Sequence, residues 1–134
     1  MTSSFVQVSA FNENLLKVLK LIHQKFPHDR NVSLIYNQVD TASRVTPRLT
    51  VVHFIKEISP FVRQVENRDQ DFFLALVKED GYKDVLSELD LHHKWSCLSE
   101  QDKEFIWTSI QTLNRLGRRI LELEISNETN MTNI

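Results

Sequence analysis

The chain is poor in the residues that make tight turns, and this limits its fold more than any other feature. It has two glycines and three prolines among 134 residues. A many-stranded β fold would need a turn signal every ~8–12 residues, and the only glycine turn dipeptide is Asp80-Gly81. The sequence therefore favours an all-α fold, in a chain of ordinary length for one domain.

Apolar residues recur at helical spacing. The clearest stripe runs from Leu15 to Phe26, with apolar residues at i, i+3, i+4, i+7 and i+11, which is the spacing of one helix face. Pro27 ends this helix, because the residue before a proline disfavours α geometry. A second, shorter helix follows, and either Asp29 or Asn31 can serve as its N-cap.

Two prolines mark the middle of the chain. Thr46-Pro47 has the pattern of an N-cap followed by a proline at the first helical position. Pro60 either kinks this third helix or separates it from a fourth. The apolar stripe continues in phase from Ile58 to Val65, so we expect a kink or a tight helix–helix joint rather than a long loop.

The last helix has the strongest start signal. Ser99 is its predicted N-cap and Asp102 the reciprocal acid, a variant of the capping box. Trp95 and Trp107 flank this box. We predict that both tryptophans pack into the core as structural anchors, whereas an exposed tryptophan would mark an interface.

These signals together predict a single-domain, all-α bundle of about five to six helices closed by a long C-terminal helix. Residues 1–8 have no clear period, and residues 126–134 are rich in Asn and Thr. We therefore expect a flexible arm at 1–8, a helical domain at 9–125 and a flexible tail at 126–134.

The sequence offers little for catalysis. The isolated glycines exclude a Walker loop and a dinucleotide turn, and the adjacent His92 and His93 diverge by about 100° on a helix, so they do not form a metal site. Cys97 is the only candidate nucleophile, although it fits better as a small buried residue. We expect no catalytic, metal-binding or cofactor-binding residue, and no cofactor.

The charge pattern leaves nucleic-acid binding open as an alternative. The net charge of −2 does not suggest a basic surface over the whole protein. Arginines cluster locally, and such a helix face can bind phosphate or can be solvated and paired within its helix, for example with Glu122. The candidate contact residues are Arg48 and Arg63 around the third helix, and Arg115, Arg118 and Arg119 on the last.

Three segments also form a recognisable pattern. They read Phe-Pro-x-Asp at 26–29, Pro-Arg at 47–48 with Arg-Asp-x-x-Phe-Phe at 68–73, and Trp-x-x-Leu-Ser-x-x-x-Lys-x-x-Ile-Trp at 95–107. In order and spacing this resembles small helical proteins encoded by nucleocytoplasmic large DNA viruses. The resemblance covers about residues 11–120, with Thr46 in place of Asn and Phe61 in place of Tyr.

The resemblance implies a viral origin and an all-α fold, and it brings no activity with it. We therefore expect a non-enzymatic viral protein, without a signal peptide or membrane span, in the host cell cytoplasm or the virion. Its expected partner is a viral or host protein, and a leftover apolar stripe on the first or last helix could also make a homo-oligomer. Alternatively, Arg48, Arg68 and Asp69 form a polar cluster that fixes the helices or meets a partner.

Overall fold

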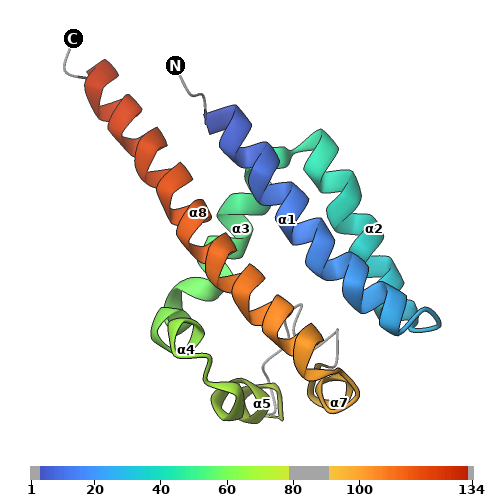
Figure 1. The fold of residues 1–134 in the computed structure, drawn as a ribbon. Coiled ribbons are helices and arrows are strands. Elements are labelled where there is room, and N and C mark those ends of the chain that lie inside the picture. The colour runs from blue at the N-terminus through green and yellow to red at the C-terminus, as the bar shows by residue number, and fades with distance from the viewer. Residues whose placement is uncertain (1–3, 79–90, 133–134) are drawn as a thin grey trace.

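The computed structural model describes residues 4–78 and 91–132, and in these ranges every regular element is a helix. The prediction of an all-α bundle closed by a long C-terminal helix is confirmed (Figure 1). The predicted helix end at Gly81 and the helix expected after it lie largely outside the described residues. The elements are α1 (Ser4–Lys25), α2 (Arg30–Val45), α3 (Pro47–Ile58), η1 (Ser59–Phe61), α4 (Val62–Glu66), α5 (Gln70–Lys78), α7 (Leu91–Trp95) and α8 (Glu100–Thr132).

The local signals for α2 and α3 are placed as the sequence indicates. Asp29 is the N-cap of α2, because its Oδ1 accepts a hydrogen bond of 3.1 Å from the Val32 N–H. Pro47 is the first residue of α3, but the side chain of Thr46 makes no cap hydrogen bond to that helix. The Thr46 hydroxyl instead donates back to the Ala42 carbonyl oxygen at 3.4 Å.

Pro60 produces a tight joint. The α-helix ends at Ile58, a single 3₁₀ turn spans Ser59–Phe61, and α4 begins at Val62. A proline has no N–H to donate, so the α-helical hydrogen-bond pattern is interrupted here. Ser59 before the proline keeps α geometry, and the backbone departs from it at Phe61, with φ −119 and ψ 20. The chain therefore changes direction just after Pro60 without a loop.

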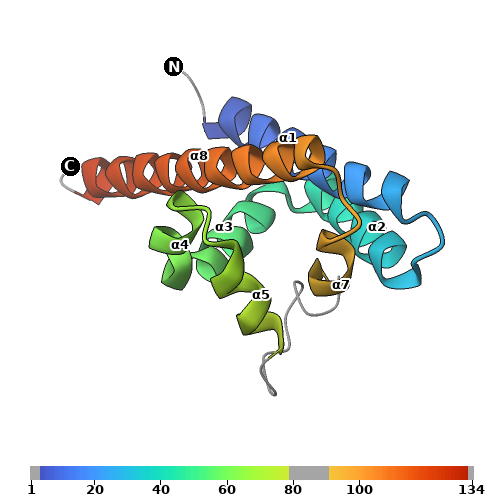
Figure 2. The same ribbon diagram turned by 60° about the horizontal axis from the view of Figure 1, so that its bottom comes forward.

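The long helices α1 and α8 pack side by side, with α2 beside α1 and with α3 against both α1 and α8 (Figure 1). Seen after a turn of 60°, α1 and α8 form one layer, and α2, α3 and α4 lie beneath it (Figure 2). The short helices α5 and α7 lie near the start of α8. No described helix is long and apolar enough to cross a membrane.

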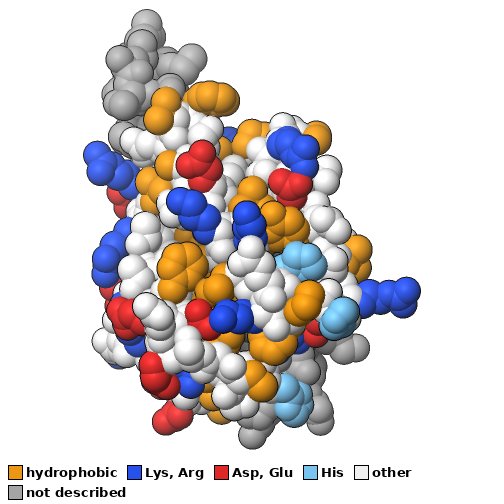
Figure 3. Space-filling view, turned by 45° about the vertical axis from the view of Figure 1, so that its right-hand side comes forward, with side chains coloured by type: hydrophobic (Ala, Val, Ile, Leu, Met, Phe, Trp, Pro, Cys, Tyr) orange, Lys and Arg blue, Asp and Glu red, His pale blue; other side chains and the backbone are white. Residues whose placement is uncertain are grey.

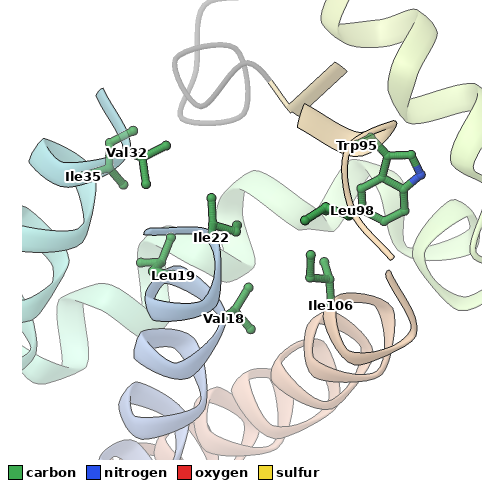
Figure 4. Packing of buried hydrophobic residues seen from close by; sticks show 8 residues of the cluster. All are labelled: Val18, Leu19, Ile22, Val32, Ile35, Trp95, Leu98 and Ile106. Carbon is green, nitrogen blue, oxygen red and sulfur yellow. The ribbon is translucent and has the colours of Figure 1, made fainter. Parts of the chain in front are cut away.

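The core consists of two clusters of buried side chains, and the half-buried Leu15 packs against both. The first cluster joins α1, α2, α7 and α8, and Figure 4 shows its side chains converging between these helices. The second lies where α1, α3 and α8 meet. The first contains Val18, Leu19, Ile22, Val32, Ile35, Trp95, Leu98 and Ile106, and the second Val8, Phe11, Val51, Leu113 and Ile120.

Both ends of the chain are more helical than predicted. Helix α1 begins at Ser4, within the expected arm, and α8 continues to Thr132, within the expected tail. In the first turns of α1, Phe5 and Val6 face solvent, so the apolar residues there do not form the stripe that a buried helix face would have. They stay helical since Val8 and Phe11 are buried and extending an existing helix costs little free energy.

Candidate interaction surface

The two predicted tryptophan anchors contact each other where α7 meets α8. Trp95 is only 7% exposed, and its ring lies edge-on to that of the half-buried Trp107, with the ring centroids 6.0 Å apart. The ammonium of Lys103 lies 5.8 Å from the centre of the Trp95 ring, a cation–π contact. The structure therefore places both tryptophans in packing rather than on a free surface.

Ser99 and Asp102 form the predicted cap of α8. The Asp102 N–H donates to the Ser99 Oγ at 3.1 Å, and the Asp102 carboxylate lies 3.3 Å from the Lys25 Nζ. Partial burial raises the pKa of Asp102, but hydrogen bonds from Ser99 and Lys25 outweigh this effect and hold the pKa below its ordinary value. The capping box thus also ties the start of α8 to the end of α1.

The arginines of the last helix make contacts within the protein. Arg115 bonds to the Glu66 carboxylate at 2.7 Å, which is the main reason why the pKa of Glu66 is lowered. The Nε of Arg118 donates to the Asn114 Oδ1 at 3.0 Å, a different partner from the expected Glu122. Arg119 is exposed. Two of the three arginines therefore already have a structural role.

The other predicted arginines lie on different helices. Arg48 is exposed in the first turn of α3, and Arg63 is exposed on α4. The predicted contact residues are thus distributed over α3, α4 and α8, and the contacts of Arg115 and Arg118 compete with binding of phosphate groups.

Arg68 is the centre of a polar cluster that the sequence suggested only as an alternative. It lies in the turn between α4 and α5 with φ 51, and it is the one non-glycine residue with positive φ in the described chain. Its guanidinium contacts three side chains of α8. These are the Glu104 Oε2 at 2.5 Å, the Thr108 Oγ1 at 3.1 Å and the Gln111 Oε1 at 3.2 Å.

Neighbouring groups complete this Arg68 cluster. The Gln111 amide donates to the carbonyl oxygens of Val65 and Glu66, at 3.1 Å each, and so satisfies the C-terminal end of α4. Asp69 accepts from the Phe72 N–H at 3.1 Å at the start of α5. The hydrogen bond from Arg68 lowers the pKa of Glu104. The cluster joins the α4–α5 turn to α8, which fits the first of the two roles suggested for Arg68 and Asp69. Arg48, the third residue suggested for the cluster, lies instead in the first turn of α3.

The candidate nucleophile differs from its prediction. Cys97 is exposed rather than buried, because it lies in the turn between α7 and α8 and not under either helix. Its Sγ lies 3.9 Å from the backbone oxygen of His93, which is not a catalytic base. Among the residues that the structure describes, no group of His, Cys, Asp and Glu side chains could hold a metal ion.

Large apolar side chains are exposed at one end of the molecule. Phe5 is 70% exposed, Val6 59%, Val45 73% and Leu49 59%; we call these four residues the apolar end. Sequence reasoning missed them, since none belongs to a periodic stripe. For Val45 and Leu49, the only sequence feature that could have indicated exposure is the predicted helix boundary at Thr46-Pro47, which lies between them.

A hydrogen bond shows how the apolar end is assembled. The Asn12 Nδ2 donates to the Pro47 oxygen at 3.1 Å, so the middle of α1 contacts the corner between α2 and α3. Phe5 precedes Asn12 by two helical turns and projects from the same side of α1. It therefore lies toward the α2–α3 corner, and Figure 1 shows the start of α1 and this corner at the same end. In Figure 3, apolar side chains are visible at the upper end of the face and also over its middle.

A shallow hollow adjoins the apolar end. Its lining comes from successive turns of α2 and the residue that follows, and it includes no charged residue: Asn37, Gln38, Thr41, Ala42, Val45 and Thr46.

No known protein family, curated protein or solved structure matches this chain.

Proposed function

We propose that the chain is a non-enzymatic helical protein of a large DNA virus that acts by binding another protein, in the virion or in the infected cell. The observation that supports this most is the apolar end. Full burial of a large apolar side chain contributes about 1.5–3 kcal/mol, so four mostly exposed side chains at this end offer a partner a substantial binding energy. A single exposed apolar residue would need no explanation, but a group of them does.

Two further observations support the same function. Arg115 is bonded to Glu66 and Arg118 to Asn114, which favours a structural role over nucleic-acid binding. Cys97 contacts a backbone oxygen rather than a base, which fits a protein without catalysis. The viral origin rests on the resemblance of residues 11–120.

Affinity purification from infected cells tests the proposal. We expect the tagged chain to retain a partner that the double variant Val45→Glu, Leu49→Glu loses, because charges on the apolar end oppose desolvation. Phe105→Glu is the matched control, since Phe105 is exposed on the first turns of α8 at the other end of the molecule. The same partners with all three proteins, or none with any of them, would contradict the proposal.

A further inference from the structure

Thr46 forms the corner between α2 and α3, and its side chain does not have the role that its position predicts. A threonine before a first-turn proline normally caps the helix that follows, yet Thr46 makes no side-chain cap hydrogen bond to α3. Its hydroxyl donates only a long bond of 3.4 Å to the Ala42 carbonyl oxygen. Since Thr46 is also exposed, this hydroxyl is accessible to another molecule.

The backbone at Thr46 is a bend rather than part of a continuous helix. Its φ of −134 and ψ of 63 lie outside the helical region. Ser59 precedes the next proline and is also exposed, but it has φ −53 and ψ −41, and its N–H donates to the Ile55 carbonyl oxygen as in a helix. Enzymes that act on a protein chain reach exposed turns more readily than continuous helices. Of these two hydroxyl groups, Thr46 is therefore the better substrate.

The charges next to Thr46 in the chain are positive. Arg44 and Arg48 stand two residues before and two residues after it, and both are exposed. No Asp or Glu lies within five residues of Thr46, whereas Ser59 has Glu57 two residues away. An added anion is opposed by neighbouring carboxylates and favoured by arginines. The sequence around Thr46 therefore accepts a new negative charge more readily than the sequence around Ser59.

We propose that Thr46 is a phosphorylation site for a proline-directed protein kinase of the infected cell. The Thr46 Oγ1 attacks the γ-phosphorus of ATP, so that a new O–P bond forms and the bond to the β-phosphate oxygen breaks. ADP leaves with the electron pair, and the hydroxyl proton passes to a base of the kinase.

Pro47 indicates the class of kinase. A proline has no N–H, so a kinase cleft that lacks an acceptor beside this position leaves no polar group of Pro47 unpaired. Any other residue there would lose the hydrogen bond of its N–H on entering such a cleft, at a cost in free energy. A kinase of this kind therefore selects the threonine that precedes Pro47.

The phosphate regulates the apolar end, and in this respect the inference rests on the proposed function. Thr46 directly follows Val45, and its carbonyl oxygen accepts from the Leu49 N–H at 3.0 Å. Phosphorylation thus places a charge of about −1.5 to −2 between these two exposed side chains. A partner that buries Val45 and Leu49 must also desolvate this charge. Phosphorylation of Thr46 therefore releases the partner.

The modified chain should keep its fold. Thr46 is the last cap of α2, where the helix dipole disfavours an anion, and it also precedes α3, where the dipole favours one. These two effects oppose each other. Arg44, which is paired with Asp40 and has a 70% exposed side chain, places a cation near the phosphate. We expect unchanged helix content by circular dichroism after phosphorylation.

Phosphorylation of the full chain in vitro tests the site. The probes are a purified cyclin-dependent kinase and a purified mitogen-activated protein kinase with Mg-ATP, and intact-mass spectrometry measures the incorporated phosphate. We expect one phosphate per chain, and none in Thr46→Val, which lacks the hydroxyl. Ser59→Ala is the matched control and should be phosphorylated like the unmodified chain. No incorporation with either kinase, or incorporation that Thr46→Val retains, would overturn the assignment.

Capture from infected cells tests the effect on the apolar end. The phosphorylated chain should retain at least about tenfold less of the partner than the unmodified chain, and phosphatase treatment should restore the capture. Thr46→Val treated with the same kinase is the control and should retain the partner in full. Equal capture by the phosphorylated and unmodified chains would overturn the regulatory role.

The two proposals can fail separately. If Val45→Glu, Leu49→Glu keeps the same partners, the proposed function fails and the release by phosphate fails with it, but the mass measured on Thr46 still decides the modification. If that double variant loses its partner and Thr46 takes up no phosphate, the proposed function stands and this inference is overturned.

Discussion

At the scale of single residues, ion pairs join helices that are distant in the sequence. The Lys94 Nζ lies 2.7 Å from the Asp29 carboxylate, and the Lys94 side chain is 7% exposed. This lysine also lies 5.6 Å from the centre of the Phe26 ring. Asp29 thus caps α2 and neutralises a buried charge from α7 at the same time, and a propensity rule can predict only the cap.

The buried pair predicts a dependence of stability on acid. The hydrogen bond from Lys94 lowers the pKa of Asp29, helped by the N–H of Val32. When the pKa of a carboxyl group is lower in the folded state, its ionised form stabilises the fold at pH values above the unfolded-state pKa of about 3.9. This stabilisation is lost as the pH falls through the folded-state pKa. Asp29→Asn keeps a cap acceptor but removes the charge. In urea unfolding, we expect this variant to be much less stable than the unmodified chain at neutral pH. The difference in unfolding free energy between the two proteins should shrink below about pH 4.

A difference in unfolding free energy that stays constant over this pH range would contradict the lowered pKa of Asp29. Asp69→Asn is the control, because it changes the other helix-capping aspartate, at the start of α5, without touching the Lys94 pair.

At Arg68, two substitutions can separate the free-energy cost of the left-handed backbone conformation from the stabilisation that the side chain provides. An L-residue in the left-handed region pays about 1–2 kcal/mol that glycine does not. Both Arg68→Ala and Arg68→Gly should lower the urea midpoint, because they remove the contacts to α8. Arg68→Gly should be the more stable of the two by about 1 kcal/mol. The opposite order would show that this turn is not held in the left-handed conformation.

At the scale of helices, Gly117 sets the distance between α8 and its neighbours. It is buried in α8, and a Cβ at this position would lie 2.6 Å from the Ile55 Cδ1 and 3.1 Å from the Phe11 ring. The absence of a side chain therefore lets α8 approach α3 and α1 closely. The sequence shows a glycine in a helical stripe, but only the packing explains it.

Gly117→Ala should destabilise the protein, because a gain of about 1 kcal/mol in helix propensity is smaller than an overpacking cost of about 1–3 kcal/mol. Ile55→Ala alone should cost about 2–4 kcal/mol. In the Gly117→Ala background it should cost less, by about 1 kcal/mol, because the new methyl group occupies part of the cavity. Additive unfolding free energies in this double-mutant cycle would rule out the close contact.

Helix starts were the most predictable part of the fold, and their physical causes are local. Pro47 and Ser99 mark the starts of α3 and α8 where the sequence placed them. The sequence left Asp29 and Asn31 as alternative caps, and the structure has Asp29. Its second contact, the ion pair with Lys94 65 residues later, cannot be recognised from spacing. The apolar end was missed for the complementary reason, since periodicity detects buried faces and not exposed ones.

At the scale of the whole molecule, the two core clusters should act as one cooperative unit. Both tryptophans belong to the first cluster or pack against it, whereas Ile120 is fully buried in the second. Leu15 packs against both clusters. Disturbance of the second cluster should therefore be transmitted to the first.

Ile120→Ala should lower the unfolding free energy by about 2–5 kcal/mol. It should shift the transition seen by tryptophan fluorescence as much as the transition seen by far-ultraviolet circular dichroism. Ile22→Ala, in the first cluster, is the matched comparison. Fluorescence that stays at its original midpoint while the helix signal shifts would show that the clusters unfold separately.

The pairing of α1 with α8 has a consequence for synthesis of the chain on the ribosome. Helix α1 ends at Lys25 and its long partner begins only at Glu100. At roughly 5–20 residues per second, translation of the intervening residues takes several seconds. Throughout that time α8 cannot yet cover its side of α1, and chaperones can bind this apolar surface on the nascent chain.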